Sequence, residues 1–191
     1  QCKICLFIDL KPHNNVNNCS YVDLNGFLKV NVRDILAPVI FGSDLADMIY
    51  TSGSTGLPKG VLLRHDGFVN MCYDQIRLFE VNSSDHVLWF ASPSFDASLS
   101  EIFMALLCGA KLVIPTKETI TDTFAFESFI KEEKVTVLTL PPVYLHQLNF
   151  DSLNLVKTLI TAGEAPILSD MRLLAKRLRY FNAYGPTEAS V

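Results

Sequence analysis

Short apolar runs alternate with amphipathic runs along the chain from residue 45 onward. LADMIY (45–50), VTVLTL (135–140) and LVKTLIT (155–161) have the length and β-branched content of buried strands. The segments between such runs place apolar residues three and four positions apart, which is the spacing of one helix face. In ASLSEIFMALLCG (97–109), for example, Leu99, Ile102 and Leu106 share a face, and the terminal glycine is a helix stop signal.

This pattern predicts an ordered series of elements. The expected strands are 45–50, 60–64, 86–92, 110–115, 135–140, 155–161 and 179–184. The expected helices are 66–81, 97–109, 123–134, 142–148 and 167–178. Strands separated by helices pair in parallel through right-handed crossovers, so we expect an α/β fold: a mainly parallel sheet with helices on both faces. In such sheets ligands bind at the carboxyl ends of the strands.

Residues 1–44 carry a weaker pattern. CLFIDL (5–10) and FLKVNV (27–32) have strand composition around the Asn-rich turn HNNVNN (13–18), without a motif that points to chemistry. We therefore expect poorly assigned N-terminal strands in 1–44 and the core of one domain in 45–191. The first residue is Gln rather than Met, which indicates a piece of a longer chain.

Composition excludes several classes of protein. With 191 residues, of which 49% are hydrophobic, the chain can bury one sizeable core. A net charge of -4 without a block of Lys and Arg argues against a nucleic-acid or anionic-membrane surface. No apolar run approaches the roughly 18 residues of a spanning helix. We expect a cytoplasmic protein without nucleic-acid or membrane partners.

The cysteines favour reduced thiols. There are five, an odd number spread through an apolar chain: Cys2, Cys5, Cys19, Cys72 and Cys108. Cys2-x-x-Cys5 has metal or redox spacing, yet no second pair follows, and a buried strand is the preferred interpretation.

The segment YTSGSTGLPKG (50–60) follows the first strong strand. Its hydroxyls and glycine-freed N–H groups can cradle phosphate oxygens, and Lys59 adds a positive charge. It is not the Walker pattern, because Pro58 precedes Lys59 and Gly60 follows it. From composition alone, a solvent-exposed turn is as good an interpretation as a phosphate loop.

Three motifs in order carry a family resemblance. The loop is similar to the phosphate-loop signature of the adenylate-forming (AMP-binding) superfamily, which includes acyl-CoA synthetases, luciferases and the amino-acid-activating domains of nonribosomal peptide synthetases. FDASLSE (95–101) resembles the aromatic-Asp motif of the amino-acid-activating members, and NAYGPTE (182–188) resembles their adenine and magnesium motif. The resemblance covers roughly 45–191 and implies part of the large N-terminal domain of such an enzyme, with ATP and Mg²⁺ as cofactors.

The resemblance implies roles in nucleotide binding. Tyr184 would stack on adenine, Thr187 would contact the α-phosphate and Glu188 would bind Mg²⁺, with Lys59, Thr187 and Glu188 as the catalytic residues. A packed tyrosine and a helix start are the alternatives. The triplet Ala-Gly-Glu at 162–164 resembles the segment beside the adenine. The implied ATP-binding residues are Thr51, Ser52, Gly53, Ser54, Thr55, Gly56, Lys59, Gly163, Tyr184, Gly185 and Thr187.

By the resemblance, Asp96 is the residue that distinguishes an amino-acid substrate from other carboxylic acids. Ser98 and Glu101 have the spacing of a capping box, so the helix is expected to begin just after Ser98 and to leave Asp96 free. The alternative is that Asp96 is itself the cap. By resemblance, Asp96 pairs with the α-ammonium of an amino-acid substrate.

The resemblance also implies the positions that line the substrate side chain. They are Ala97, Ser100, Thr139, Ile160, Ala162, Ala183 and Val191. Small and apolar lining residues favour a large apolar or aromatic amino acid, phenylalanine or tyrosine above others. Ordinary core packing is the alternative, and is preferred for Ile160 and Ala162.

The implied reaction is attack of an amino-acid carboxylate on the α-phosphorus of ATP. It gives aminoacyl-AMP and pyrophosphate, and the aminoacyl group then passes to the phosphopantetheine thiol of a carrier protein. The chain stops before the family's ribose-binding Asp, hinge and small C-terminal domain, so we expect at best weak activity from it alone.

Three other functions stay open. One is a fatty- or aryl-acid CoA ligase of the same superfamily, which has no ammonium to bind. Another is a non-catalytic nucleotide-binding remnant. A P-loop kinase or ATPase is disfavoured by Pro58 and Gly60.

Overall fold

The computed structural model describes residues 4–7, 20–23, 39–52 and 57–189. The chain divides into two units, Gln1–Ile40 and Phe41–Val191. In the first unit, strand β1 (Ile4–Phe7) pairs in parallel with β2 (Ser20–Asp23). Strand β1 overlaps the run expected at 5–10, whereas the strand expected at 27–32 lies outside the described residues, as do Cys2 and Cys19.

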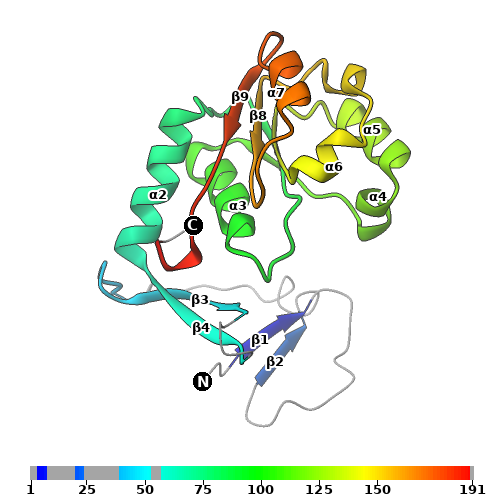
Figure 1. The fold of residues 1–191 in the computed structure, drawn as a ribbon. Helices are drawn as coiled ribbons and strands as arrows, with labels where there is room; N and C mark the ends of the chain where they lie inside the picture. Colours follow the sequence, from blue (N-terminus) through cyan, green and yellow to red (C-terminus); the bar gives the residue numbers. More distant parts are fainter. Residues whose placement is uncertain (1–3, 8–19, 24–38, 53–56, 190–191) are drawn as a thin grey trace. The chain divides into compact units, whose positions relative to one another are not determined.

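A five-stranded parallel sheet organises the second unit (Figure 1). Its spatial order is β6-β5-β7-β8-β9, and every neighbouring pair is parallel. The strands are β5 (His86–Leu88), β6 (Lys111–Val113), β7 (Val137–Leu140), β8 (Thr158–Thr161) and β9 (Arg179–Asn182). The mainly parallel α/β fold predicted from the sequence is therefore confirmed.

Helices cover both faces of this sheet, because successive strand residues point to opposite sides. Val87, Val137 and Ile160 pack in one buried cluster with Met104 and Ala105 of α3 (Asp96–Cys108) and Phe79, which follows α2 (His65–Leu78). Their neighbours Leu88, Leu138 and Leu159 pack in a second cluster, with Phe126 of α5 (Thr123–Glu132), Leu145 of α6 (Pro142–His146) and Leu174 of α7 (Leu168–Leu174). The sheet thus separates an α2–α3 side from an α5–α7 side (Figure 1).

Strands β3 (Leu45–Thr51) and β4 (Lys59–Arg64) form a separate antiparallel pair. The glycine-rich loop therefore follows the carboxyl end of β3, as expected, but β3 and β4 form a hairpin of their own and are not strands of the parallel sheet. A connection this short cannot make a parallel crossover, which needs a dozen or more residues. Helix α4 (Lys117–Thr121) and the 3-10 turn η1 (Phe150–Leu153) are short elements that the sequence pattern did not predict.

The start of α3 differs from the predicted capping box. The helix begins at Asp96, not after Ser98, and no side chain caps it. The hydroxyl of Ser98 donates to the carbonyl of Phe95 (2.7 Å), and Glu101 is turned inward and 1% exposed. The helix ends as expected at Gly109, whose φ of 74° is a left-handed conformation that glycine adopts without strain.

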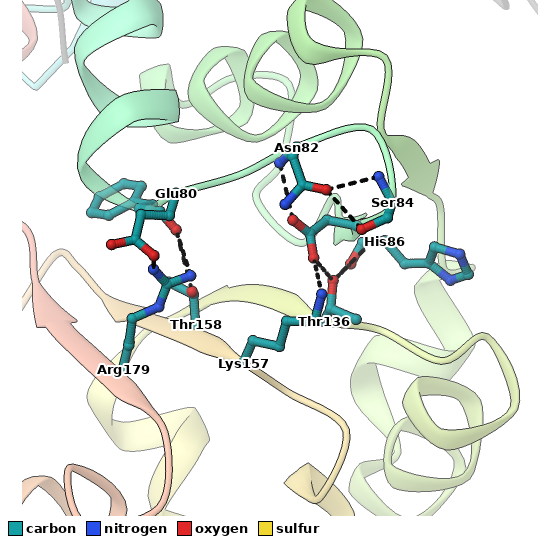
Figure 2. Close-up of polar contacts among 10 residues, drawn as sticks. Glu80, Asn82, Ser84, His86, Thr136, Lys157, Thr158 and Arg179 are labelled. Carbon is teal, nitrogen blue, oxygen red and sulfur yellow. Dashed lines mark hydrogen bonds and ion pairs between the residues drawn. The ribbon is translucent and has the colours of Figure 1, made fainter.

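A buried polar cluster ties together the amino ends of three strands (Figure 2). Asp85, which precedes β5 and is 2% exposed, accepts hydrogen bonds from the Thr136 hydroxyl (2.9 Å), the Lys157 ammonium (2.9 Å) and the Asn82 N–H (3.0 Å). Thr136 and Lys157 immediately precede β7 and β8. Both carboxylate oxygens of Asp85 are therefore satisfied within the fold.

Among the helices that the structure describes, none combines the length and apolarity needed to cross a membrane.

Candidate functional site

The carboxyl ends of the parallel strands meet at one edge of the sheet. From that edge, β5 leads into the segment that reaches Asp96, β8 leads into Ala162 and Gly163, and β9 leads into Ala183 and Tyr184. The sequence motifs around Asp96 and Tyr184 are therefore brought to the same side of the molecule by strand direction alone.

A side-chain contact joins these two motifs. The hydroxyl of Thr187 donates a hydrogen bond to Oδ2 of Asp96, across 91 residues of sequence. The other oxygen, Oδ1, accepts the N–H of Ala97 at 2.7 Å. Asp96 is half-buried, and within residues 39–52 and 57–189 it enters no ion pair. A carboxylate has about four acceptor positions, so capacity for a cationic donor remains.

Strand β4 connects the hairpin to the same place. It lies against η2 (Thr187–Ala189), the 3-10 turn that carries Thr187 and Glu188. Lys59 is the exposed first residue of β4, paired in register with the half-buried Thr51. In the described part of the chain, no hydrogen bond or ion pair joins Lys59 to Asp96, Thr187 or Glu188. Of the other loop positions, Ser52 is exposed, while Gly53, Ser54, Thr55 and Gly56 lie outside the described residues.

The residues that are expected to bind adenine are accessible to solvent. Tyr184 is 95% exposed, which excludes the alternative that it is a packed core tyrosine. Gly163 has a φ of 89°, and an added Cβ would meet no atom of the described residues within 4 Å. Gly185 is exposed next to Tyr184. An exposed ring and an uncovered glycine suit stacking on a planar ligand.

Glu188 fits the way Mg²⁺ binds in phosphate-transfer sites. Its side chain is exposed, and among the residues described it has no hydrogen-bond or ion-pair partner. No group of three or more His, Cys, Asp or Glu gathers in that part of the chain. Mg²⁺ commonly uses one or two carboxylates together with substrate phosphates and water, for which a single free carboxylate suffices.

The expected substrate positions lie mostly on the α2–α3 side of the sheet. Thr139 of β7 pairs with Ile160 of β8. Both side chains point to the same face of the sheet as Val137, which packs with α3. Ala183 packs against the same cluster, and Ala97 and Ser100 belong to α3. Ala162 is half-buried just beyond β8, and Val191 lies outside the described residues. Ile160 is 2% exposed and acts as a core residue in this structure.

Two residues near these positions were missed from the sequence. The Ser100 hydroxyl donates to Oε1 of Gln75 on α2, a residue without a motif around it. Glu101 was interpreted as a helix cap but is buried, with its carboxyl turned toward the segment after β5. Helical spacing offered a signal for Glu101, because it precedes the fully buried Met104 and Ala105 by three and four positions.

Comparisons with known proteins identify the family of this chain. A sequence model described as "AMP-binding enzyme" matches residues 13–191. The chain therefore belongs to the AMP-binding enzyme family. Its relatives within the family are adenylation domains of nonribosomal peptide synthetases, as the motifs predicted.

Tyrocidine synthase 1 of Brevibacillus parabrevis is 47% identical over 149 residues, which cover 78% of this chain and 14% of that protein. Gramicidin S synthase 1 of Brevibacillus brevis is 46% identical over 149 residues, again 78% of this chain and 14% of the relative. The chain thus spans about one seventh of the length of these curated relatives.

Solved structures show the same fold. The nonribosomal peptide synthetase FmoA3 in its AMPPNP-bound form superposes with a TM-score of 0.79 at 26% identity, over 91% of this chain and 19% of that one. The N-terminal subdomain of Klebsiella oxytoca NpsA, in complex with 3-hydroxyanthranilyl-AMSN, gives a TM-score of 0.76 at 27% identity, over 91% of this chain and 46% of that one.

Proposed function

We propose that this chain forms the nucleotide and amino-acid site of an enzyme that activates an amino acid as aminoacyl-AMP. The substrate carboxylate attacks the α-phosphorus of ATP, a new carboxyl–phosphate bond forms, and the bond to pyrophosphate breaks. The aminoacyl group then passes to the phosphopantetheine thiol of a carrier protein. The contact between Asp96 and Thr187 carries this proposal, because it brings the expected ammonium-binding carboxylate to the expected phosphate-binding hydroxyl.

The chemistry requires positioning more than a protein nucleophile. Thr187 can donate to an α-phosphate oxygen by rotating its hydroxyl away from Asp96, which then accepts from the substrate ammonium. Lys59 and the loop amides supply positive charge to the phosphates, as is general in phosphate-transfer sites. Mg²⁺ held at Glu188 would neutralise charge that develops on the phosphates.

We propose a large apolar or aromatic amino acid as the substrate. Most of the described positions assigned to its side chain belong to α3 or to the sheet face toward α3, and Ser100 and Thr139 are the polar residues among them. Structural neighbours were solved with compounds of different acids, such as 3-hydroxyanthranilyl-AMSN and glycyl-adenosine-5'-phosphate, so the side-chain class is inferred from these residues and not from the neighbours.

Amino-acid-dependent exchange of pyrophosphate into ATP tests the proposal in the full-length protein that carries this chain. We expect exchange with phenylalanine or tyrosine, and little with acidic or small amino acids. Calorimetric binding of nonhydrolysable aminoacyl-adenylate mimics provides an independent ranking of side chains. Exchange that is equal with no amino acid and with every amino acid would contradict amino-acid activation.

An aryl-acid ligase is the second candidate, since a structural neighbour was solved with an anthranilyl adenylate mimic. Replacing Asp96 separates the two. In Asp96→Ala, loss of a charge-assisted contact worth about 1.5–3 kcal/mol should lower kcat/KM for the amino acid at least tenfold. Activity with an aryl acid should survive in the same variant. Unchanged amino-acid kinetics would remove the ammonium role of Asp96 and favour the aryl-acid function.

A further inference from the structure

Glu101 is a buried carboxyl group, the last residue of the FDASLSE motif, and has no substrate or nucleotide role assigned above. It lies on α3, is 1% exposed, and accepts two hydrogen bonds at Oε2, from the N–H of Phe90 (3.0 Å) and of Ala91 (2.9 Å). The second oxygen, Oε1, is shielded from solvent and has no hydrogen-bond partner among the described residues. A buried polar group in this state is costly, so its presence calls for a compensating role.

The two N–H groups belong to the segment that leads from β5 to Asp96. Trp89 makes the last sheet contact, through its N–H to the Val113 carbonyl (2.9 Å). Phe90 and Ala91 then leave the sheet, and their N–H groups go to Glu101 instead. The Trp89 indole N–H also donates to the Ala91 carbonyl at 2.8 Å. The base of the segment is therefore fixed against the helix that begins with Asp96.

The rest of the segment depends on that base. Residues 92–95 are exposed, and Ser92 and Phe95 form a local turn through the Phe95 N–H and the Ser92 carbonyl (2.9 Å). Because Glu101 lies on the same helix as Asp96, it closes a loop between the strand end and the helix start. Without this bridge, the two hydrogen bonds that join Phe90 and Ala91 to α3 are lost.

We propose that Glu101 is a positioning residue, which sets the place of Asp96 by binding the Phe90 and Ala91 N–H groups to α3. This inference rests on the proposed function, in which Asp96 binds the substrate ammonium. Displacement of a binding group by about 1 Å can cost up to a hundredfold in rate, so a loose loop base affects amino-acid binding without touching the substrate. Tyr184 and Gly163, the residues assigned to the adenine, follow β9 and β8 and not this loop, so we expect their contacts to be kept, whereas Thr187, assigned to the α-phosphate, contacts Asp96.

The test compares Glu101→Met with Glu101→Gln in the full-length protein. Methionine has a similar volume but no acceptor for the two N–H groups, whereas glutamine keeps one acceptor oxygen. We expect Glu101→Met to raise the KM for the amino acid by about tenfold with the KM for ATP within about twofold of wild type. Glu101→Gln should hold the amino-acid KM within about threefold, which is rescue by the conservative variant.

Two further variants keep the result interpretable. If Glu101→Met does not fold, Glu101→Asp retains the carboxyl group but shortens the reach by one methylene, and should raise the amino-acid KM by about fivefold. Asp85→Asn is the matched control, because Asp85 is equally buried but lies at the opposite edge of the sheet. It should lower stability and leave the amino-acid KM unchanged.

The outcomes separate this inference from the proposed function. An unchanged amino-acid KM in folded Glu101→Met or Glu101→Asp would overturn the positioning role while wild-type activity stands. An equal rise in the KM values for amino acid and ATP would also overturn it, since that marks general loosening of the fold. Absence of amino-acid-dependent exchange in the wild-type protein would instead refute the proposed function.

Discussion

Asp85 and Glu101 are two buried carboxyl groups at opposite edges of one sheet, and their surroundings differ. Asp85 has a donor for each oxygen and a lysine nearby. Burial alone would raise its pKa, but hydrogen bonds from Lys157, the Asn82 N–H and Thr136, with the lysine charge, bring the pKa below its ordinary 3.8. For Glu101, burial outweighs the N–H groups of Ala91 and Phe90 and raises the pKa from 4.5 to about 8.

This difference follows from the different roles of the two edges of the sheet. At the edge where the strands begin, here called the amino edge, the side chains hydrogen-bond to one another. The buried polar cluster of Figure 2 therefore stabilises the fold. At the carboxyl edge, polar groups remain available: Glu188 and Tyr184 are exposed and one oxygen of Glu101 has no partner in the part of the chain described. Polar groups without hydrogen-bond partners at one edge of a sheet mark a place where ligand binding or a particular loop conformation has been favoured over stability.

The largest predicted effect is that the two carboxyls give opposite dependences of stability on pH. The folded state raises the pKa of Glu101, so its favourable contribution holds at low pH and is lost as pH rises from about 5 to about 8. At 1.36 kcal/mol per pH unit, the loss is on the order of 4 kcal/mol. The folded state lowers the pKa of Asp85, so its contribution holds above 3.8 and is lost as pH falls through the lowered value.

Urea unfolding of the chain between about pH 3 and pH 9 measures both slopes. Glu101→Gln should flatten only the decline above pH 5, and Asp85→Asn should flatten only the decline in acid. A variant that removed both slopes, or neither, would contradict the assignment of each slope to one carboxyl.

The next effect in size concerns the amino-edge cluster itself. Asp85→Ala leaves the Asn82 N–H and the Thr136 hydroxyl without their acceptor, and should lower the free energy of unfolding by about 2–3 kcal/mol at pH 7. The loss stays below that of a fully buried ion pair, because the Lys157 side chain is 53% exposed and can be solvated. Where the variant is folded, its amino-acid KM should equal that of wild type.

The matched control for this variant is Glu80→Gln, which removes the ion pair between Glu80 and Arg179 at the same edge. The Glu80 side chain is 73% exposed, so the change should cost less than about 1 kcal/mol. If the free energy of unfolding fell by a similar amount in both variants, the burial of Asp85 would not explain the contribution of the cluster to stability.

Much of the fold was predictable from the sequence, because hydrophobic period and element length record burial directly. Runs such as VTVLTL and the helix pattern of ASLSEIFMALLCG predicted β7 and α3, and the alternation of strands with helices predicted parallel pairing. The β3–β4 pairing was less accessible, since a glycine-rich loop after a strand is compatible with either a hairpin or an entry into a helix.

Polar residues were harder to place than apolar ones. Ser98 and Glu101 fit a capping box by spacing, yet the helix starts three residues earlier, at Asp96, and Glu101 instead binds the N–H groups of the segment after β5. The burial of Asp85 could not be predicted, because only its Asn82 partner is local, whereas Thr136 and Lys157 are 51 and 72 residues away. The motif resemblance implied that Asp96 and Thr187 belong to one site, and the structure brings the two side chains into contact, while their roles stay predictions.

The smallest predicted effect tests the exposed tyrosine of the carboxyl edge. Tyr184→Leu keeps an apolar side chain but removes the ring, so the KM for ATP should rise about fivefold, equivalent to about 1 kcal/mol of lost stacking. Tyr184→Phe keeps the ring and should match wild type. Stability should be unchanged in both, because 95% of the residue is exposed and little packing is lost. If leucine and phenylalanine gave the same KM for ATP, Tyr184 would not stack on the nucleotide, and the contrast between the two edges would rest on the carboxyls alone.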